Sequence, residues 1–390
     1  MTYIKSFSVT GLAGRKGTVR RSINRDTNIF WGFNGCGKTS LLKILHSALA
    51  NNAGTLIRVP FKSATVTFYS TTYQTDFTRK ITKAAILEAT AGIHGKSEAS
   101  QIALLDSGTF GWETTVKKTD LPEKAKELKF KHTYLSINRI NESNKRFMYS
   151  PRAEFGPAAL DEETLDALFA QQIKSIWQNY NTKSLTAIRE VQEKGLALTL
   201  SSVLGGSEKL RKEGVPSMDS KRAYEVVRDF FADQRLRRHL KLGTYASFAK
   251  NYERDPLLRT VVSEISEVQL EIEAALEPQL KIQQLVNDMY GGDKELTFRR
   301  GQLEITSNGE EISIESLSGG EKQLLRLLLE CLAVEDSTML IDEPELSLHV
   351  DWQHRLIEAM RIVNPGAQLI MATHSPDIMA DLSEDRIFPL

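Results

Sequence analysis

The sequence predicts an α/β fold interrupted by a helical insert, and three observations support this. A short apolar stretch from Asn28 to Trp31 runs into a glycine-rich loop and then into a helical pattern, which gives the order strand, loop, helix. A second apolar stretch, Thr338 to Ile341, has the same strand character near the other end of the chain. Between them, from Asp161 onward, apolar residues recur at spacings of three and four.

The first 155 residues carry mostly strand patterns. Alternating or β-branched stretches predict strands within residues 3–9, 18–23, 28–31, 64–81 and 131–140. The run from Thr39 to Leu49 predicts a helix directly after the glycine loop. Residues 95–111 are small and polar, so we expect a region rich in loops.

The middle of the chain is predicted to be helical in three blocks, at about 161–200, 221–239 and 255–289. Glycines and a proline in residues 205–217 separate the first two blocks. Pro278 should bend or split the third. No run sustains the heptads of a long coiled-coil arm, so we expect a compact helical lid or a short arm.

The last hundred residues return to α/β character. Residues 295–315 predict a hairpin or meander, with turns at Arg300-Gly301 and Asn308-Gly309. A helix, the strand at 338–341, a helix at 351–363, a strand at 368–372 and a short strand near Ile387 follow. We therefore predict three parts, namely residues 1–155, an insert or lid at 156–292, and residues 293–390, with the first and last forming one lobe.

Composition points to a soluble cytoplasmic protein. Hydrophobic residues make up 41% of the chain and charged residues 26%, and the formal net charge is zero. A neutral chain is not drawn as a whole to nucleic acid or to an anionic membrane. The start lacks a signal-peptide pattern, no apolar run approaches a membrane span, and two cysteines fit a reducing compartment.

Residues 32–39, Gly-Phe-Asn-Gly-Cys-Gly-Lys-Thr, match the pattern GxxxxGK[ST]. Glycines let backbone N–H groups turn toward phosphate oxygens, Lys38 reaches the β- and γ-phosphates, and the Thr39 hydroxyl binds Mg²⁺. The helix that follows directs its positive end at the same anion. The candidate nucleotide-binding residues are Gly32, Asn34, Gly35, Cys36, Gly37, Lys38, Thr39 and Ser40.

Acidic residues and a histidine follow two later strands. Asp342 ends the strand at 338–341, where it could hold Mg²⁺, and Glu343 is the candidate general base for the attacking water. His374 follows the strand at 368–372, where it could sense the γ-phosphate. The alternatives are an acidic pair that caps a turn before Pro344 and a purely structural histidine.

The phosphate loop, LSGGEKQ, DEPELSLH and THSP occur in that order. Together they resemble the ABC-type ATPases, and within them the branch with SMC, RecF and OLD-like proteins. The resemblance implies an ABC-type ATPase head, a mixed sheet with flanking helices, that carries the helical insert. It also implies that Ser318, Gly319 and Gly320 complete the ATP site of a second copy, so that two chains sandwich two ATP molecules. Ser347 and Leu348 would lie near the dimer axis.

One part of the family pattern has no firm counterpart. The glutamine that should follow a core strand and sense Mg²⁺ could be Gln74. The stretch YLSINRI, residues 134–140, instead resembles the YLPxxR element of some defence-associated ATPases, which would bring Asn138 or Arg139 to the nucleotide.

The resemblance extends to ATPase subunits of anti-phage systems such as Septu, PARIS and retron-linked modules. Only 14 residues follow Pro376, where OLD-type proteins carry their nuclease. We therefore expect a dimerising ATPase, within a dimer or a larger assembly, that regulates a separate nuclease or toxin. The alternatives are a RecF-like DNA repair ATPase and an ATP-gated scaffold with slow hydrolysis.

DNA stays open as a partner because of one basic stretch. Residues 209–241 contain ten Lys or Arg against five Asp or Glu, which could meet phosphates or form a solvated helical face. The two cysteines should also differ in behaviour. Cys36 lies beside Lys38 at a helix start, which favours a reactive thiolate, whereas Cys331 lies in an apolar run and should be inert.

Overall fold

The computed structural model describes residues 1–91, 111–118, 127–136, 162–204, 218–233, 243–299 and 301–390. The chain divides into two compact units. Unit 1 contains residues 1–177 and 282–390, and unit 2 contains residues 178–281. Two helices, α5 (Glu162–Leu204) and α8 (Pro256–Tyr290), each contribute residues to both units.

Unit 1 contains a parallel sheet with the strand order β13-β3-β12-β11-β7. Strands β11 and β12 are buried along their whole length, as expected for a parallel sheet covered on both faces. Because the strands are parallel, their carboxyl ends meet at one edge. The strand bounds are β3 (Thr27–Trp31), β7 (His132–Leu135), β11 (Thr338–Asp342), β12 (Gln368–Thr373) and β13 (Ile387–Pro389).

A second sheet in unit 1 is antiparallel, with the strand order β2-β1-β4-β5-β6. Residues along β4 and β5 alternate strictly between buried and more exposed, which is the pattern of a sheet with one packed face. The strand bounds are β1 (Thr2–Thr10), β2 (Thr18–Ser22), β4 (Ser63–Ser70), β5 (Thr75–Thr82) and β6 (Glu113–Val116), and helix α2 (Lys83–Ala91) follows β5.

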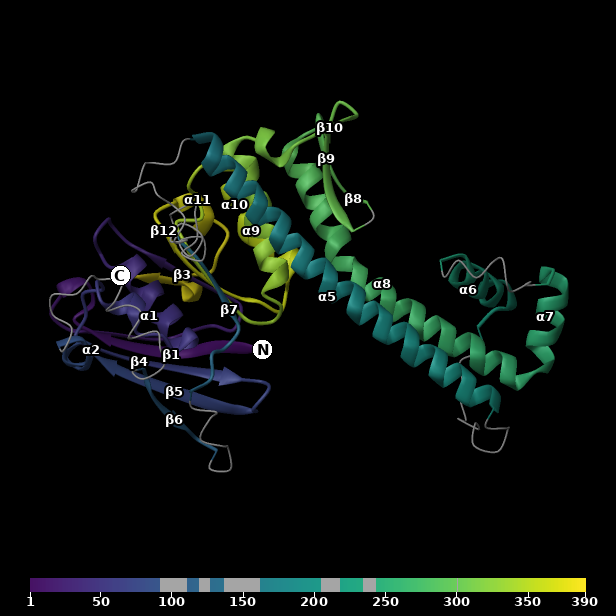
Figure 1. The fold of residues 1–390 in the computed structure, drawn as a ribbon, viewed down its shortest axis with the longest axis horizontal. Helices are drawn as coiled ribbons and strands as arrows, with labels where there is room; N and C mark the ends of the chain where they lie inside the picture. The colour runs from purple at the N-terminus through teal and green to yellow at the C-terminus, as the bar shows by residue number, and fades with distance from the viewer. Residues whose placement is uncertain (92–110, 119–126, 137–161, 205–217, 234–242, 300) are drawn as a thin grey trace, which may run out of the picture. The chain divides into compact units, whose positions relative to one another are not determined.

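Helix α1 (Lys38–Ala50) lies between these two sheets (Figure 1). Its Leu41 and Leu45 share one buried cluster with Phe68 of the antiparallel sheet and Ile370 of the parallel sheet. A buried glutamine also ties the sheets together. The Gln368 side chain accepts a hydrogen bond from the Ile4 N–H and donates one to the Ile4 carbonyl, both at 2.8 Å. The glycine loop between β3 and α1 is thereby held from both sides.

The rest of unit 1 contains a small antiparallel sheet and the helices beside it. Trp177, near the middle of α5, stacks on Phe298 with ring centroids 4.0 Å apart, and Arg326 of α9 lies over Phe169 of α5. The elements are β8 (Lys294–Arg299), β9 (Gln302–Ser307), β10 (Glu310–Ile312), α9 (Gly319–Ala333), α10 (Val350–Val363) and α11 (Pro376–Met379).

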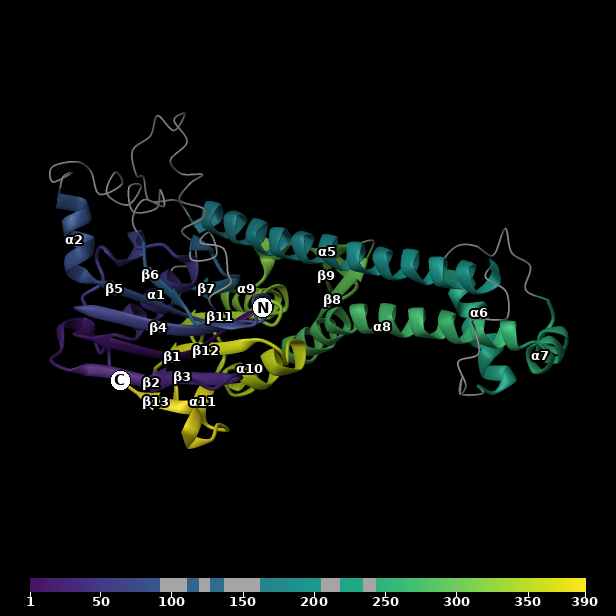
Figure 2. The same cartoon turned by 90° about the horizontal axis from the view of Figure 1, so that it is seen from below.

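Unit 2 is helical. Helices α6 (Ser220–Asp233) and α7 (Tyr245–Arg254) form a small core in which Ala223, Phe248 and Val262 are buried together. The unit 2 portions of α5 and α8 run side by side (Figure 2), and they approach most closely at Gly195. A Cβ at that glycine would lie 2.2 Å from a methyl carbon of Val268.

The fold class predicted from the sequence, α/β with a mixed set of sheets, flanking helices and a helical insert, is confirmed. Helix α5 has 43 residues and α8 has 35, so they are about 65 and 50 Å long, which favours the predicted arm over the compact lid. Pro278 lies inside α8 and does not split it. The predicted loops at 95–110 and 205–217 lie outside the described residues.

Candidate nucleotide-binding site

The glycine loop joins the carboxyl end of β3 to the first residue of α1. Gly37, which caps α1, has a φ of 103°, a conformation that favours glycine. A Cβ there would also lie 3.0 Å from the Cβ of Ala13. The loop conformation therefore depends on glycine for two separate reasons, backbone strain and lack of space.

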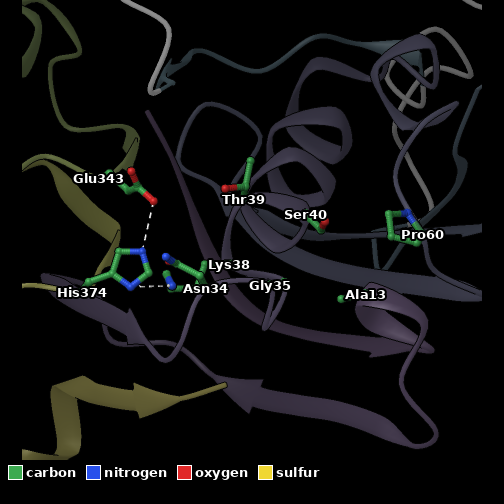
Figure 3. Close-up of a pocket in the computed structure, with 10 residues that line it drawn as sticks. Ala13, Asn34, Gly35, Lys38, Thr39, Ser40, Pro60, Glu343 and His374 are labelled. Atoms are coloured by element: carbon green, nitrogen blue, oxygen red, sulfur yellow. Dashed lines mark hydrogen bonds and ion pairs between the residues drawn. The ribbon is translucent and has the colours of Figure 1, made fainter. Parts of the chain in front are cut away.

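A pocket of about 330 Å³ opens over this loop (Figure 3). It brings together the loop, the start of α1 and the residues that follow β11 and β12. Sequence reasoning missed Ala13 and Pro60, which line it from the side of the antiparallel sheet. The sequence signal that could have indicated a loop near Ala13 is the motif Gly-Leu-Ala-Gly at 11–14. In the structure Gly11, Ala13 and Gly14 of this motif have positive φ. The lining residues are Ala13, Asn34, Gly35, Gly37, Lys38, Thr39, Ser40, Pro60, Glu343 and His374.

Three side chains in the pocket form a continuous chain of contacts (Figure 3). The buried Lys38 donates from Nζ to the Gly32 carbonyl at 2.7 Å, and Nζ lies 3.1 Å from Nδ1 of His374. Nε2 of His374 lies 3.1 Å from Oε1 of Glu343. A carboxylate can only accept, so Nε2 carries a proton, whereas Nδ1 lies 3.1 Å from both Nζ of Lys38 and the Gly32 carbonyl, and its role depends on the protonation of the ring.

Asp342 ends β11 and is 3% exposed. Burial, reinforced by the charge of Glu343, raises the pKa of Asp342 to about 6, although the Thr39 hydroxyl and nearby lysines act in the opposite direction. Neither carboxylate oxygen has a hydrogen-bond partner of normal geometry among the described residues. Two buried, unsatisfied oxygens beside a threonine hydroxyl are a donor set that fits a hard divalent cation such as Mg²⁺.

Glu343 adopts a left-handed backbone conformation with a φ of 50°, which is uncommon for a residue with a side chain. The backbone N–H of Glu343 donates to the Ala372 carbonyl of the neighbouring strand at 2.8 Å. This bond holds the unusual conformation and turns the carboxylate toward His374. Strain of this kind is common at functional sites, because the surrounding structure has to maintain it.

The residues of the signature motif lie at the start of α9. Ser318 caps the helix, and its hydroxyl and Glu321 form a reciprocal capping box. Ser318 and Gly319 are exposed, and residues 318–320 are not among those that line the pocket. Nζ of Lys294 lies 2.8 Å from both carboxylate oxygens of Glu321. Although burial alone would raise the pKa of Glu321, the bonds from Lys294 and Ser318 hold it below its usual value.

None of the three candidates for the missing glutamine position is placed in the pocket. Gln74 lies in the β4–β5 turn, at the end of the hairpin opposite Pro60. Strands of eight residues separate the two ends by about 25 Å. Asn138 and Arg139 lie outside the described residues.

Cys36 belongs to the loop but does not line the pocket. It is 3% exposed, and its Sγ lies close to Gly32, where a Cβ would be 2.9 Å from the sulfur. The expectation of a readily accessible thiol at Cys36 is therefore wrong. Cys331 is fully buried, and burial raises the pKa of its thiol to about 12, which agrees with the expectation that it is inert.

Comparisons with known proteins agree with this geometry. The family described as "AAA domain, putative AbiEii toxin, Type IV TA system" matches residues 198–380, a stretch with the signature, Asp342, Glu343 and His374. The "Retron Vc95 probable ATPase" of Vibrio cholerae serotype O1 biovar El Tor is 33% identical over 98 residues, which cover 22% of this chain and 19% of that protein.

A second relative has a similar name. The "Retron Ec83 probable ATPase" of Escherichia coli is 32% identical over 114 residues, which cover 25% of this chain and 21% of the relative. Over about a quarter of its length, the chain is thus similar to two proteins named as probable ATPases of retrons. The matched stretch spans about a fifth of the length of each curated relative.

Two solved structures are also similar to the chain. One is the Smc head domain with an extended coiled coil bound to the C-terminal domain of ScpA from Pyrococcus furiosus. The TM-score is 0.42 and the identity 13%, and the match covers 100% of this chain and 93% of that chain. The other is the SmcHead bound to the C-winged helix domain of ScpA, with a TM-score of 0.44, 12% identity and coverage of 99% and 94%. Among the described residues, no helix has the length and apolar character needed to cross a membrane.

Proposed function

We propose that this chain binds ATP with Mg²⁺, hydrolyses it as a homodimer in the cytoplasm, and thereby controls a separate effector in anti-phage defence. The observation that carries the proposal is the convergence of Lys38, Glu343 and His374 on one pocket, with the unsatisfied carboxylate of Asp342 beside Thr39. We retain the predicted parts, residues 1–155 and 293–390 as the ATPase lobe and 156–292 as the insert.

The start of α1 suits a polyphosphate. Backbone N–H groups of the glycine loop and the helix N-terminus favour an anion, and Lys38 supplies a full positive charge. In the structure the Lys38 ammonium bonds to the Gly32 carbonyl, which is a neutral partner that a phosphate oxygen can replace. The remaining loop residues, Asn34, Gly35, Cys36 and Ser40 among them, would shape the cradle.

Thr39 and Asp342 would hold the Mg²⁺ ion, which supplies charge neutralisation for the phosphates when it is bound. A divalent cation would also favour the ionised form of Asp342, whose pKa is raised by burial. The chain's own contribution is to keep this carboxylate desolvated and free of other hydrogen-bond partners.

Glu343 would act on the attacking water. A general base must lie within hydrogen-bond reach of the proton that it accepts, and the strained backbone turns this carboxylate into the pocket. The N–H at Nε2 of His374 donates to Glu343 and keeps it oriented, while Nδ1 lies beside Lys38. His374 is thus placed to respond to whatever Lys38 binds.

The exposed start of α9 supports the dimer. Ser318, Gly319 and Gly320 present a helix N-terminus but do not line the pocket of their own chain. We propose that they bind the γ-phosphate held by a second copy, in a two-fold arrangement with two ATP molecules. Ser347 and Leu348, in the turn beside Gly320, would then lie near the dimer axis.

The proposal of a separate effector rests on the similarity to proteins named as retron probable ATPases and on the family description, which names a toxin system. We expect the partner to be a nuclease or a toxin encoded beside this gene, within a complex that could exceed the dimer. The basic stretch 209–241, a candidate for DNA contacts, lies largely outside the described residues.

ATP turnover tests the core of the proposal. The purified protein should release phosphate from ATP only with Mg²⁺, and Lys38→Ala should abolish nucleotide binding. Lys129→Ala, which removes an exposed lysine elsewhere in the same unit, is the matched control and should behave as wild type. Turnover that survives Lys38→Ala would overturn the assignment. Co-purification with the product of the neighbouring gene, followed by mass measurement, tests the effector.

A further inference from the structure

Glu345 makes a contact that the proposed mechanism does not use. It lies in the turn after β11, and its Oε1 accepts a hydrogen bond from the backbone N–H of His374, with 2.7 Å between oxygen and nitrogen. His374 directly follows the last residue of β12. The Glu345 carboxylate therefore holds the backbone of the residue whose side chain lies between Lys38 and Glu343.

The second oxygen of the same carboxylate is not satisfied. Oε2 of Glu345 is buried and has no hydrogen-bond partner among the described residues. Leaving a buried oxygen unpaired is unfavourable, and more so for a charged group. A carboxylate with a purely structural role would normally have both oxygens paired.

The turn that begins at Glu345 also reaches the signature helix. The Leu348 N–H donates to the Glu345 carbonyl at 3.0 Å, which closes the turn. Between them Ser347 has a φ of 67°. Its carbonyl oxygen lies so near the first turn of α9 that a Cβ added at Gly320 would be 2.5 Å from it. Residues 345–348 therefore touch the backbone of His374 on one side and that of Gly320 on the other.

We propose that Glu345 is a positioning residue that couples His374 to the signature helix α9 of the same chain. The inference rests on the proposed function. A movement of His374 when the γ-phosphate is bound or lost would pass through Glu345 to Ser347 and then to Gly320. Because α9 would serve the partner's nucleotide, this path links one ATP site of the dimer to the other. Glu345 itself does not line the pocket and acts through His374 and Gly320.

Amide hydrogen exchange tests the path without requiring hydrolysis. In Glu345→Ala, exchange at His374 should be at least about tenfold faster because its N–H loses its acceptor, and exchange in the first turn of α9 should also be faster because the 345–348 turn lies against it. Glu345→Gln retains an oxygen acceptor of the same size and should restore protection. Glu358→Ala, on the exposed face of α10, is the control. Unchanged exchange in the first turn of α9 in Glu345→Ala would overturn the coupling.

Mixed dimers test whether the path reaches the partner's site. A Glu345→Ala chain is paired with a Ser318→Arg chain, so the Glu345→Ala chain still binds ATP in its own loop, and the remaining active site uses the partner's phosphate loop and the signature helix of the Glu345→Ala chain. Its turnover should be at least about fivefold below that of a dimer of wild-type and Ser318→Arg chains. Equal turnover in the two mixed dimers would overturn the inference.

These outcomes are separate from the failure of the proposed function. If the wild-type protein did not hydrolyse Mg-ATP at all, the proposed function would fail, and hydrogen exchange would still decide whether Glu345 couples His374 to α9. If the wild-type protein is active and Glu345→Ala leaves both exchange and the mixed-dimer turnover unchanged, only the inference fails.

Discussion

Helices α1 and α9 both begin with backbone N–H groups that can bind an anion, yet their surroundings differ. Around the start of α1 lie a lysine, two carboxylates and a histidine, namely Lys38, Asp342, Glu343 and His374. Beside the start of α9 lie Lys294, whose Nζ is engaged by both oxygens of Glu321, and Lys322, which pairs with Asp166. One helix start thus carries the groups of phosphate chemistry, whereas the other has its charge neutralised within the chain.

The glycines at the two helix starts differ in the same way. Gly37 is needed because its φ of 103° and the nearby Ala13 exclude a side chain. Gly320 has an ordinary helical backbone and is needed because the Ser347 carbonyl approaches it closely. The first glycine shapes a site within the chain, while the second lets a turn lie against the signature helix. In the proposed dimer, the start of α1 in one chain and the start of α9 in the second copy would together form one nucleotide site.

Removal of the base at the α1 start should have the largest effect. Glu343→Gln keeps the shape of the side chain but cannot accept a proton, so turnover should fall by about 10²–10⁴. ATP should still bind, and the ATP-bound dimer should accumulate, which size-exclusion chromatography with ATP would detect. Glu358→Gln, an exposed carboxylate on α10, should retain full turnover. Near-normal turnover in Glu343→Gln would remove this residue from the mechanism.

A change at the α9 start should separate binding from turnover. Ser318→Arg places bulk and charge at the exposed cap, so turnover and ATP-driven dimerisation should fall by about 10² or more. Affinity for ATP in the monomer should stay within about twofold, because the chain's own loop binds it. Mixing this variant with Lys38→Ala should restore at most one of the two composite sites. Loss of ATP binding by the Ser318→Arg monomer would contradict the division of roles.

The charge at Asp342 should reduce stability in the absence of Mg²⁺. Its folded pKa of about 6 lies above the ordinary value of 3.8, so the folded state binds this proton more tightly than the unfolded state. The cost of about 3 kcal/mol is fully present above pH 7 and disappears as the pH falls from 6 toward 4. Asp342→Asn should therefore raise the melting temperature at pH 8 and lose the stabilisation by Mg²⁺.

Thermal unfolding at several pH values checks this expectation. The difference in stability between Asp342→Asn and wild type should shrink below pH 6, whereas Asp381→Asn, at an exposed aspartate after α11, should show no such trend. A variant that is less stable than wild type at pH 8 without Mg²⁺ would indicate that Asp342 has a stabilising partner.

The smallest effect is expected at Cys36. Its side chain is buried and does not line the pocket, so Cys36→Ala should leave ATP turnover within about twofold of wild type. Both cysteines are buried, so an alkylating reagent should modify the native protein much more slowly than the urea-unfolded protein. Peptide mapping after brief labelling checks this, and rapid modification of Cys36 that Mg-ATP prevents would show that the thiol is accessible from the pocket.

Local sequence was enough for the phosphate loop, the two buried strands and the general fold class. The loop needs only eight consecutive residues, and the apolar runs at 338–341 and 368–372 are characteristic of buried parallel strands. The order of motifs also placed Asp342, Glu343 and His374 at strand ends. Each of these features depends on residues that are close together in the sequence.

The tertiary structure decided which of these residues meet. Lys38 and His374 are 336 positions apart in the sequence, and Ser347 and Gly320 are 27 positions apart. A local sequence pattern does not predict contacts between residues so far apart along the chain. The same holds for Cys36, which looks reactive in sequence but is buried against Gly32 in the folded loop. Burial and long-range contact depend on the packing of whole elements, which local spacing does not specify.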